Sequence, residues 1–240
     1  MLFIKNPLSI FPNYCKLTER VCELNSKGVQ GPYLSIQERF LKNMNNIICV
    51  YSSSSCNIDD VYFETAVELG RQIALQKDIL LFGGGLLGLM GATAKAIHQN
   101  GGKVIGIIPK ALNLQGVVYE SCDELVITEG LRERKALMDS KSQAFIALPG
   151  GYGTLEELLE IITLKQLGYH NKPVVILNVN GFYQNLLAFF EQFIDQHFAK
   201  PDCRKLYHVV DNVQEALAYI DSYQPFIFRE KWLTDSESNK

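Results

Sequence analysis

The segment from Ala144 to Glu157, with the sequence AFIALPGGYGTLEE, constrains the fold more than any other stretch of the chain. It begins with a short continuous apolar run, which is typical of a strand buried on both faces of a parallel sheet. Pro149 ends this run, and from Thr154 onward apolar residues recur at helical spacing. Glycine permits the tight turn between the two elements, and it is present as Gly150, Gly151 and Gly153. The segment therefore predicts a buried strand, a glycine turn and a helix N-terminus, in that order.

A turn of this kind leaves backbone N–H groups unpaired at the start of a helix, where the helix dipole also attracts an anion. We interpret it as a phosphate site. The expected substrate-binding residues at this turn are Gly150, Gly151, Tyr152, Gly153, Thr154, Leu155 and Glu156. Thr154 and Glu157 also have the spacing of a capping box, which closes a helix without any ligand. Spacing alone does not decide between these two interpretations. The segment is neither a P-loop nor a GxGxxG dinucleotide motif.

Short apolar runs alternate with segments of helical periodicity along the rest of the chain. Strands are expected at 46–52, 79–82, 103–108, 124–127, 144–148, 173–177 and 207–210, and helices at 60–76, 90–99, 131–140, 154–167, 183–197 and 212–223. This alternation predicts a doubly wound, Rossmann-like α/β fold, in which a parallel sheet carries helices on both faces. We expect a single such domain at 46–223, an N-terminal extension at 1–45 with a short helix at 35–43, and a C-terminal tail at 224–240.

Composition excludes several classes of function. The net charge is −3 without a block of like charges, so we expect neither a nucleic-acid nor a membrane partner. No apolar run is long enough to span a membrane and no signal peptide is recognisable, which favours a cytoplasmic protein. The 6 cysteines are scattered without a CxxC pair and are expected to be buried free thiols. The 4 histidines are isolated, so no metal site is predicted.

Ligands of an open α/β sheet bind outside the carboxyl ends of its strands. This rule places four loops at one rim of the sheet, at 52–56, 83–88, 109 and 149–154. A small phosphorylated ligand would fit there. Gly84 lies in the glycine-rich GGGLLGLMG segment, where glycine allows either close approach to a ligand or tight helix–strand packing. These two alternatives stay open.

Three motifs resemble one known family. PGGYGTLEE, GGGLLGLMG at Gly83 to Gly91 and ERK at Glu133 to Lys135 are similar to segments of the Lonely Guy (LOG) proteins, which are often labelled lysine decarboxylase-like. The resemblance covers roughly residues 46–223, and PGGxGTxxE is a specific signature of the family. LOG proteins are cytokinin-activating phosphoribohydrolases and are usually dimers. The resemblance implies a homodimer that hydrolyses a nucleoside 5′-monophosphate, such as a cytokinin riboside monophosphate or AMP, to free base and ribose 5-phosphate without a cofactor or metal.

The same resemblance assigns roles to individual residues. Glu157 is the last residue of the signature and Arg134 belongs to the family's RK pair, so both are expected to be catalytic. A carboxylate near the ribose can stabilise positive charge at the anomeric carbon or accept a proton from water. Arg134 offers a planar, permanently charged fork for phosphate or ribose oxygens. Further substrate contacts are implied for Lys135, Thr163, Ser54 and Ser55. Without the resemblance, the charges of Arg134 and Lys135 would indicate only a solvent-exposed face of the helix.

The chain departs from the family at several positions. Leu131 and Arg132 replace a Met-His pair, Gly116 replaces a substrate-contacting Glu, and Ser53 replaces a Gly. These changes leave the phosphate turn intact and put the preferred base in question. An alternative function is a nucleotide-binding regulatory protein with little turnover. A lysine decarboxylase would need pyridoxal phosphate on a Schiff-base lysine, and no lysine here has a recognisable setting for one.

Overall fold

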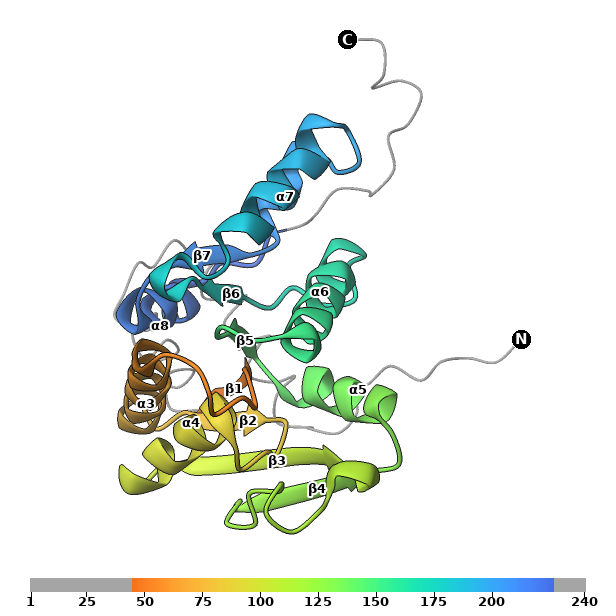
Figure 1. The fold of residues 1–240 in the computed structure, drawn as a ribbon. Helices are drawn as coiled ribbons and strands as arrows, with labels where there is room; N and C mark the ends of the chain where they lie inside the picture. The colour runs from red at the N-terminus through yellow and green to blue at the C-terminus, as the bar shows by residue number, and fades with distance from the viewer. Residues whose placement is uncertain (1–44, 227–240) are drawn as a thin grey trace, which may run out of the picture. The chain divides into compact units, whose positions relative to one another are not determined.

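A computed structural model of the chain describes residues 45–226. A sheet of seven parallel strands runs through this part in the order β4-β3-β2-β1-β5-β6-β7 (Figure 1). The strands are β1 (Ile47–Tyr51), β2 (Ile79–Phe82), β3 (Lys103–Pro109), β4 (Glu124–Thr128), β5 (Ala144–Ala147), β6 (Val174–Leu177) and β7 (His208–Val210). The helices are α3 (Asp60–Leu75), α4 (Gly88–Gln99), α5 (Leu131–Lys141), α6 (Tyr152–Gln166), α7 (Gln184–Asp195) and α8 (Val213–Ser222).

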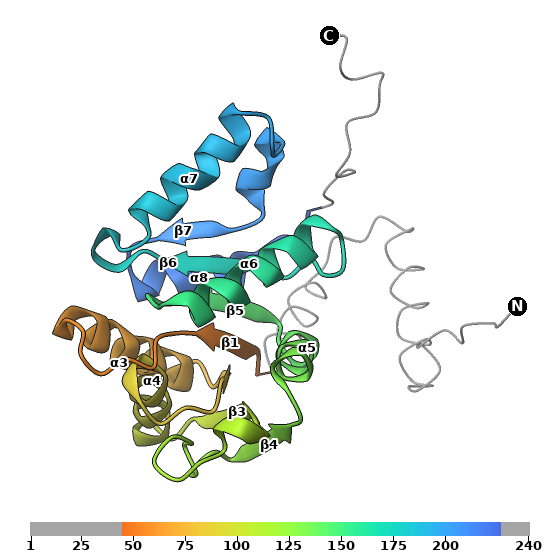
Figure 2. The same ribbon diagram turned by 45° about the vertical axis from the view of Figure 1, so that its right-hand side comes forward.

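Helices cover both faces of the sheet (Figures 1 and 2). On one face, α3, α4 and α8 pack against the side chains of alternate strand residues such as Ile48, Val50 and Ile146. On the other face, α5, α6 and α7 pack against the intervening residues, among them Cys49, Phe145 and Ile176. Strands β5 and β6 are buried along their whole length. The predicted doubly wound α/β fold is confirmed.

The strand order reverses direction between β1 and β5. From β1 the chain proceeds to β2, β3 and β4 on one side, and from β5 it proceeds to β6 and β7 on the other. The loops after β1 and after β5 therefore diverge, and in open α/β sheets ligands bind at such a switch point. β1 and β5 are in register, with Tyr51 opposite Ala147, and Leu148 N–H donates to the Tyr51 carbonyl at 2.9 Å. The glycine turn follows directly at this point.

Most predicted helices and strands are observed, with ends that differ by one or two residues. Short 3-10 turns at Lys110–Leu112, Val179–Gly181 and Pro201–Lys205 were not predicted. Cys49 and Cys203 are buried free thiols as expected, whereas Cys56 is exposed. The extension, its helix at 35–43, Cys15 and Cys22 lie outside the described residues, as does the tail from 227 onward. The boundaries at 45 and 223 stay predictions.

No helix within residues 45–226 is long and apolar enough to cross a membrane. The expected cytoplasmic location stays a prediction. In the same part of the chain, no cluster of His, Cys, Asp and Glu side chains could hold a metal ion.

Candidate active site

The glycine turn after β5 presents a row of open backbone amides. Helix α6 begins at Tyr152, and its first hydrogen bond closes from Leu155 N–H to the Gly151 carbonyl at 3.0 Å. Within residues 45–226, none of the N–H groups from Gly150 to Thr154 donates to another backbone or side-chain group. The turn is exposed from Gly151 to Gly153. Open amides at the positive end of a long helix form a ready site for a phosphate or carboxylate.

The structure decides against the capping box at this helix start. Gly151 is the N-cap residue and no side chain caps the helix. Thr154 is already inside the first turn and is buried, with its side chain directly over Gly150. A Cβ on Gly150 would lie 2.1 Å from Thr154 Oγ1, so glycine is required here for Thr154 to pack. No side chain of the described residues therefore occupies these amides. Tyr152 is 94% exposed and directs its ring into solvent.

Glu157 and Arg134 form a partly enclosed ion pair beside this turn. Arg134 Nη1 lies 2.9 Å from Glu157 Oε1, and the two side chains are 12% and 10% exposed. Arg134 reaches Glu157 from α5, and its Nε donates to the Ile107 carbonyl of β3 at 3.0 Å. Glu157 follows Thr154 by about one helical turn, roughly 5 Å along the axis. The two residues predicted to be catalytic are thus held together next to the open amides.

A glycine that the sequence analysis did not select makes room for Arg134. A Cβ on Gly83, at the end of β2, would lie 2.2 Å from Arg134 Nη2. Because Nε and Nη1 are already engaged by Ile107 and Glu157, the guanidinium has little freedom to move away. Within the described part of the chain, Nη2 donates no hydrogen bond, so this edge of the fork is unpaired. The only signal for Gly83 in the sequence was the run of three glycines, and this run did not distinguish Gly83 from its two neighbours.

Burial raises the pKa of Glu157, which is 8% exposed, above the ordinary glutamate value. The adjacent Arg134 guanidinium opposes this effect by favouring the ionised carboxylate, and the Glu156 charge adds to it. A buried carboxylate with a raised pKa, held by one arginine at the edge of a sheet, is a candidate acid–base group.

Lys135 is occupied by two carboxylates of α6. Its Nζ forms ion pairs with Glu156 and, at 2.6 Å, with Glu160, and its side chain is 15% exposed. These partners raise the pKa of Lys135 against the opposing effect of partial burial. The lysine therefore joins α5 to α6. In this structure its ammonium is engaged with protein carboxylates.

The serine loop after β1 and the glycine-rich loop after β2 bind each other. The Ser53 carbonyl accepts hydrogen bonds from Leu89 N–H at 2.9 Å and Met90 N–H at 3.4 Å, so the first amides of α4 are largely occupied. Gly88, at a φ of 62°, packs against the backbone of Ser54. The predicted contact residues Ser54 and Ser55 are exposed at the rim.

Gly84 lies beneath the surface of this rim. It is buried at a φ of 74°, and its carbonyl accepts a hydrogen bond from Tyr119 N–H at 2.8 Å. Of the two alternatives left open for this segment, the structure favours packing at Gly84.

Other predicted positions are exposed to solvent. Thr163 is exposed on α6, and its hydroxyl donates to the Leu159 carbonyl at 2.7 Å. Gly116, Leu131 and Arg132 are also exposed. Their expected roles stay predictions.

Comparisons with known proteins agree with this architecture. A family model described as "Possible lysine decarboxylase" matches residues 90–220. One cytokinin riboside 5′-monophosphate phosphoribohydrolase of Arabidopsis thaliana is 42% identical over 178 residues, which cover 74% of this chain and 82% of the relative. Another enzyme of the same name from that plant is 40% identical over 189 residues, covering 77% of this chain and 83% of the relative.

Solved structures show the same fold. The molybdenum cofactor carrier protein of Chlamydomonas reinhardtii matches with a TM-score of 0.58 and 27% identity, over 74% of this chain and 96% of that one. The molybdenum cofactor binding protein of Rippkaea orientalis matches with a TM-score of 0.58 at 23% identity, over 75% and 98% of the two chains. With the sequence relatives, the motifs and the fold in agreement, the chain belongs to the LOG family of cytokinin riboside 5′-monophosphate phosphoribohydrolases.

Proposed function

We propose that this protein hydrolyses the N-glycosidic bond of a nucleoside 5′-monophosphate, releasing the free base and ribose 5-phosphate. The observation that carries the proposal is the Arg134–Glu157 ion pair, with Nη1 and Oε1 2.9 Å apart, about one helical turn from the open amides. The amides from Gly150 to Thr154 suit the dianionic 5′-phosphate. A phosphate anchored there would bring the attached ribose toward Glu157.

In the proposed reaction the bond between C1′ and the base nitrogen breaks, and its electron pair leaves with the base. The anomeric carbon gains oxocarbenium-like charge, which the ionised Glu157 carboxylate stabilises across a short distance. A water oxygen then bonds to C1′. The proton lost by this water passes to Glu157 and finally to the departing base, so the carboxylate is regenerated. The raised pKa of Glu157 suits a group that accepts and returns a proton.

Arg134 would act on both Glu157 and the substrate. Through Nη1 it keeps Glu157 ionised, and through the open Nη2 edge it can orient a ribose or phosphate oxygen. The relatives named above act on cytokinin riboside 5′-monophosphates. For this chain we propose cytokinin nucleotides or AMP as substrates, since the changes at Gly116, Leu131 and Arg132 concern the base surroundings and leave the phosphate turn intact.

The deciding experiment measures base release from AMP and isopentenyladenosine monophosphate by chromatography. We expect turnover by the wild-type protein and a loss of roughly 10²- to 10⁴-fold in Glu157→Gln, which retains shape but cannot take a proton. Glu160→Gln is the matched control, because Glu160 is on the same helix and faces Lys135. Equal activity of wild type and Glu157→Gln would exclude Glu157 from the mechanism.

The alternative is a nucleotide-binding regulatory protein with little turnover. The carrier protein of Chlamydomonas reinhardtii has this fold, and its name describes carriage of a cofactor. Measurable AMP binding without base release from either substrate would favour this alternative and would direct attention to Gly116.

Lysine decarboxylation, the activity in the family model's description, is poorly supported by the lysine nearest the site. Lys135 is bound by Glu156 and Glu160, whereas a Schiff base requires a free amine. The absorption spectrum of the purified protein tests this activity, because a bound aldimine absorbs visible light.

We also propose that the protein is a cytoplasmic homodimer. Two exposed apolar side chains support the dimer, because Leu131 on α5 and Leu159 on α6 are 56% and 40% exposed. Thr163 lies on the same helix as Leu159 and would approach the partner chain in such a dimer.

A further inference from the structure

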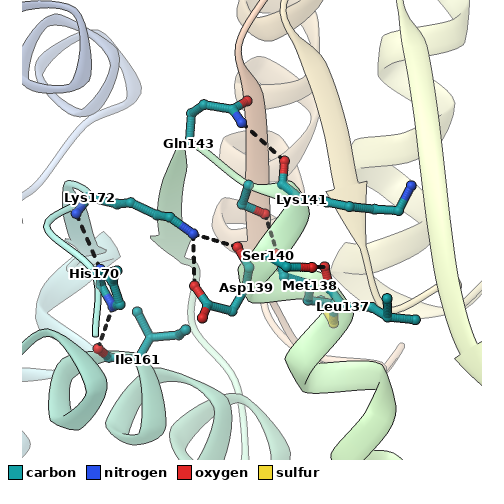
Figure 3. A network of polar contacts seen from close by, with 10 residues as sticks. Leu137, Met138, Asp139, Ser140, Lys141, Gln143, Ile161, His170 and Lys172 are labelled. Carbon is teal, nitrogen blue, oxygen red and sulfur yellow. Dashed lines mark hydrogen bonds and ion pairs between the residues drawn. The ribbon is translucent and has the colours of Figure 1, made fainter. Parts of the chain in front are cut away.

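The loop between α6 and β6 joins the two helices that carry the candidate catalytic residues. Figure 3 shows two of its polar side chains pointing in different directions, Lys172 toward Asp139 of α5 and His170 toward Ile161 of α6. Arg134 lies on α5 and Glu157 on α6. None of the functions assigned above uses this loop.

Lys172 fixes the C-terminal end of α5. Its Nζ donates to Asp139 Oδ1 at 2.8 Å and to the Asp139 carbonyl at 2.5 Å. The carbonyl is one of the last of the helix, where a cation is favourable because of the helix dipole. The ammonium also lies 5.5 Å from the ring centre of Phe145 on β5. Both ion-pair side chains are 25% exposed, so water screens the pair less than an open surface pair.

His170 fixes the middle of α6. Its Nε2 lies 2.9 Å from the carbonyl of Ile161, which follows Glu157 by one turn. A carbonyl only accepts hydrogen bonds, so Nε2 carries the proton, and Nδ1 accepts the Lys172 backbone N–H at 3.2 Å. The ring is buried and packs against Phe145, with ring centres 5.6 Å apart. One short loop thereby fastens α5, α6 and β5 together.

We propose that Lys172 and His170 are positioning residues, which hold α5 and α6 at the spacing at which Arg134 reaches Glu157. The inference rests on the proposed function only for its kinetic consequence. Arg134 contacts Glu157 through one pair of atoms, Nη1 and Oε1. A small shift of α5 would therefore lengthen the distance between them. Displacements of about 1 Å remote from the chemistry can lower a rate by about 10²-fold.

The test compares Lys172→Met, Lys172→Arg and Asp139→Asn with wild type. In Lys172→Met we expect kcat to fall about 10- to 100-fold. We also expect the pKa of Glu157 to rise, because the arginine that favours its ionised form is less well placed. Lys172→Arg keeps the charge and should recover most of both properties. Asp139→Asn should resemble Lys172→Met.

Lys141→Met is the matched control. Lys141 also makes an ion pair from the last turn of α5, with Glu124 at 2.9 Å, but this pair is more exposed. We expect Lys141→Met to leave kcat and the Glu157 pKa unchanged. An equal effect of Lys141→Met and Lys172→Met would overturn the specific role of Lys172.

The Glu157 pKa is followed by carbon-13 NMR of protein labelled in its glutamate carboxyls, with Glu157→Gln supplying the assignment. This readout needs no turnover, so it tests the positioning role even if wild type releases no base and the proposed function fails. A lower urea midpoint in Lys172→Met, together with a wild-type Glu157 pKa, would show that the loop only stabilises the fold, and the proposal would be wrong.

Discussion

At the scale of single residues, two opposing effects set the protonation of Glu157. Burial raises its pKa and Arg134 lowers it. If the ionised carboxylate is the active form, activity falls as the pH drops through this pKa, and the fall begins above the range of an ordinary glutamate. The environment of one side chain therefore predicts where the acid limb of the pH–rate profile lies.

Replacing Arg134 by glutamine tests this balance. The variant loses the charge that favours ionised Glu157, so the acid limb of kcat/KM should move to higher pH, while the maximal rate falls by about 10²-fold. The measurement is a pH–rate profile of base release. Lys141→Gln is the control, because Lys141 is a cation on the same helix that pairs with Glu124 and has no role in the proposed site. An acid limb at the wild-type position in Arg134→Gln would show that Glu157 is not the group that titrates.

Lys165 is a residue whose burial should destabilise the protein. It is 2% exposed, and its Nζ has no hydrogen-bond partner among the described residues. The ammonium lies 4.8 Å from the ring centre of Tyr223, a contact that offsets part of the cost of removing it from water. Burial lowers the pKa of Lys165 from 10.5 to about 8.

Lys165→Met should raise the free energy of unfolding at pH 7 by about 1–3 kcal/mol. The folded-state pKa is below the unfolded value, so the unfolded chain binds more protons and the wild type gains stability as pH rises from 8 toward 10.5. Methionine has no such titration. Urea denaturation should therefore show the advantage of the variant shrinking over this range. A constant difference between the two proteins would contradict the assigned cost of burying the charge.

At the scale of elements, the turn after β2 makes room for Arg134, the side chain of α5 that reaches into the candidate site. Gly83→Ala places a methyl group where Arg134 Nη2 now lies, since a Cβ at this position would be only 2.2 Å from that nitrogen. Arg134 must then leave Glu157 or the turn must shift. We expect base release to fall about 10²-fold, with far-ultraviolet circular dichroism unchanged. Gly130→Ala is the control, because a Cβ at Gly130 would meet nothing within 4 Å. Full activity of Gly83→Ala would show that the close approach is unimportant.

The sequence predicted the elements because burial and periodicity are local signals. The apolar run at Ala144–Ala147 and the glycine turn after it were recognisable without any tertiary information. Motif resemblance also placed Arg134 and Glu157 in one site. By contrast, the ion pairs that occupy Lys135 come from Glu156 and Glu160 of a different helix, and only packing brings them together. The roles of Gly83 and Lys172 likewise depend on side chains distant in sequence.

At the scale of the whole molecule, exposed leucines on α5 and α6 support the proposed association of two chains. Lys135 joins the two helices through Glu156 and Glu160. Leu131 precedes Lys135 by one turn and Leu159 follows Glu156 by nearly one turn, so both lie near these ion pairs. They are 56% and 40% exposed, and neither has a packing role in the described core. A partly apolar face beside the active-site helix is suited to an interface.

Leu159→Glu should convert the proposed homodimer to a monomer, because it places a charge at the centre of this face next to Glu156 and Glu160. Light scattering coupled to size-exclusion chromatography measures the mass directly. Phe189→Glu is the control, since Phe189 is 53% exposed and belongs to α7, not to α5 or α6. If wild type is a dimer and Leu159→Glu is a monomer, base release by the monomer tells whether each site is complete within one chain. A dimeric Leu159→Glu, or a dimer lost only in Phe189→Glu, would move the interface away from α6.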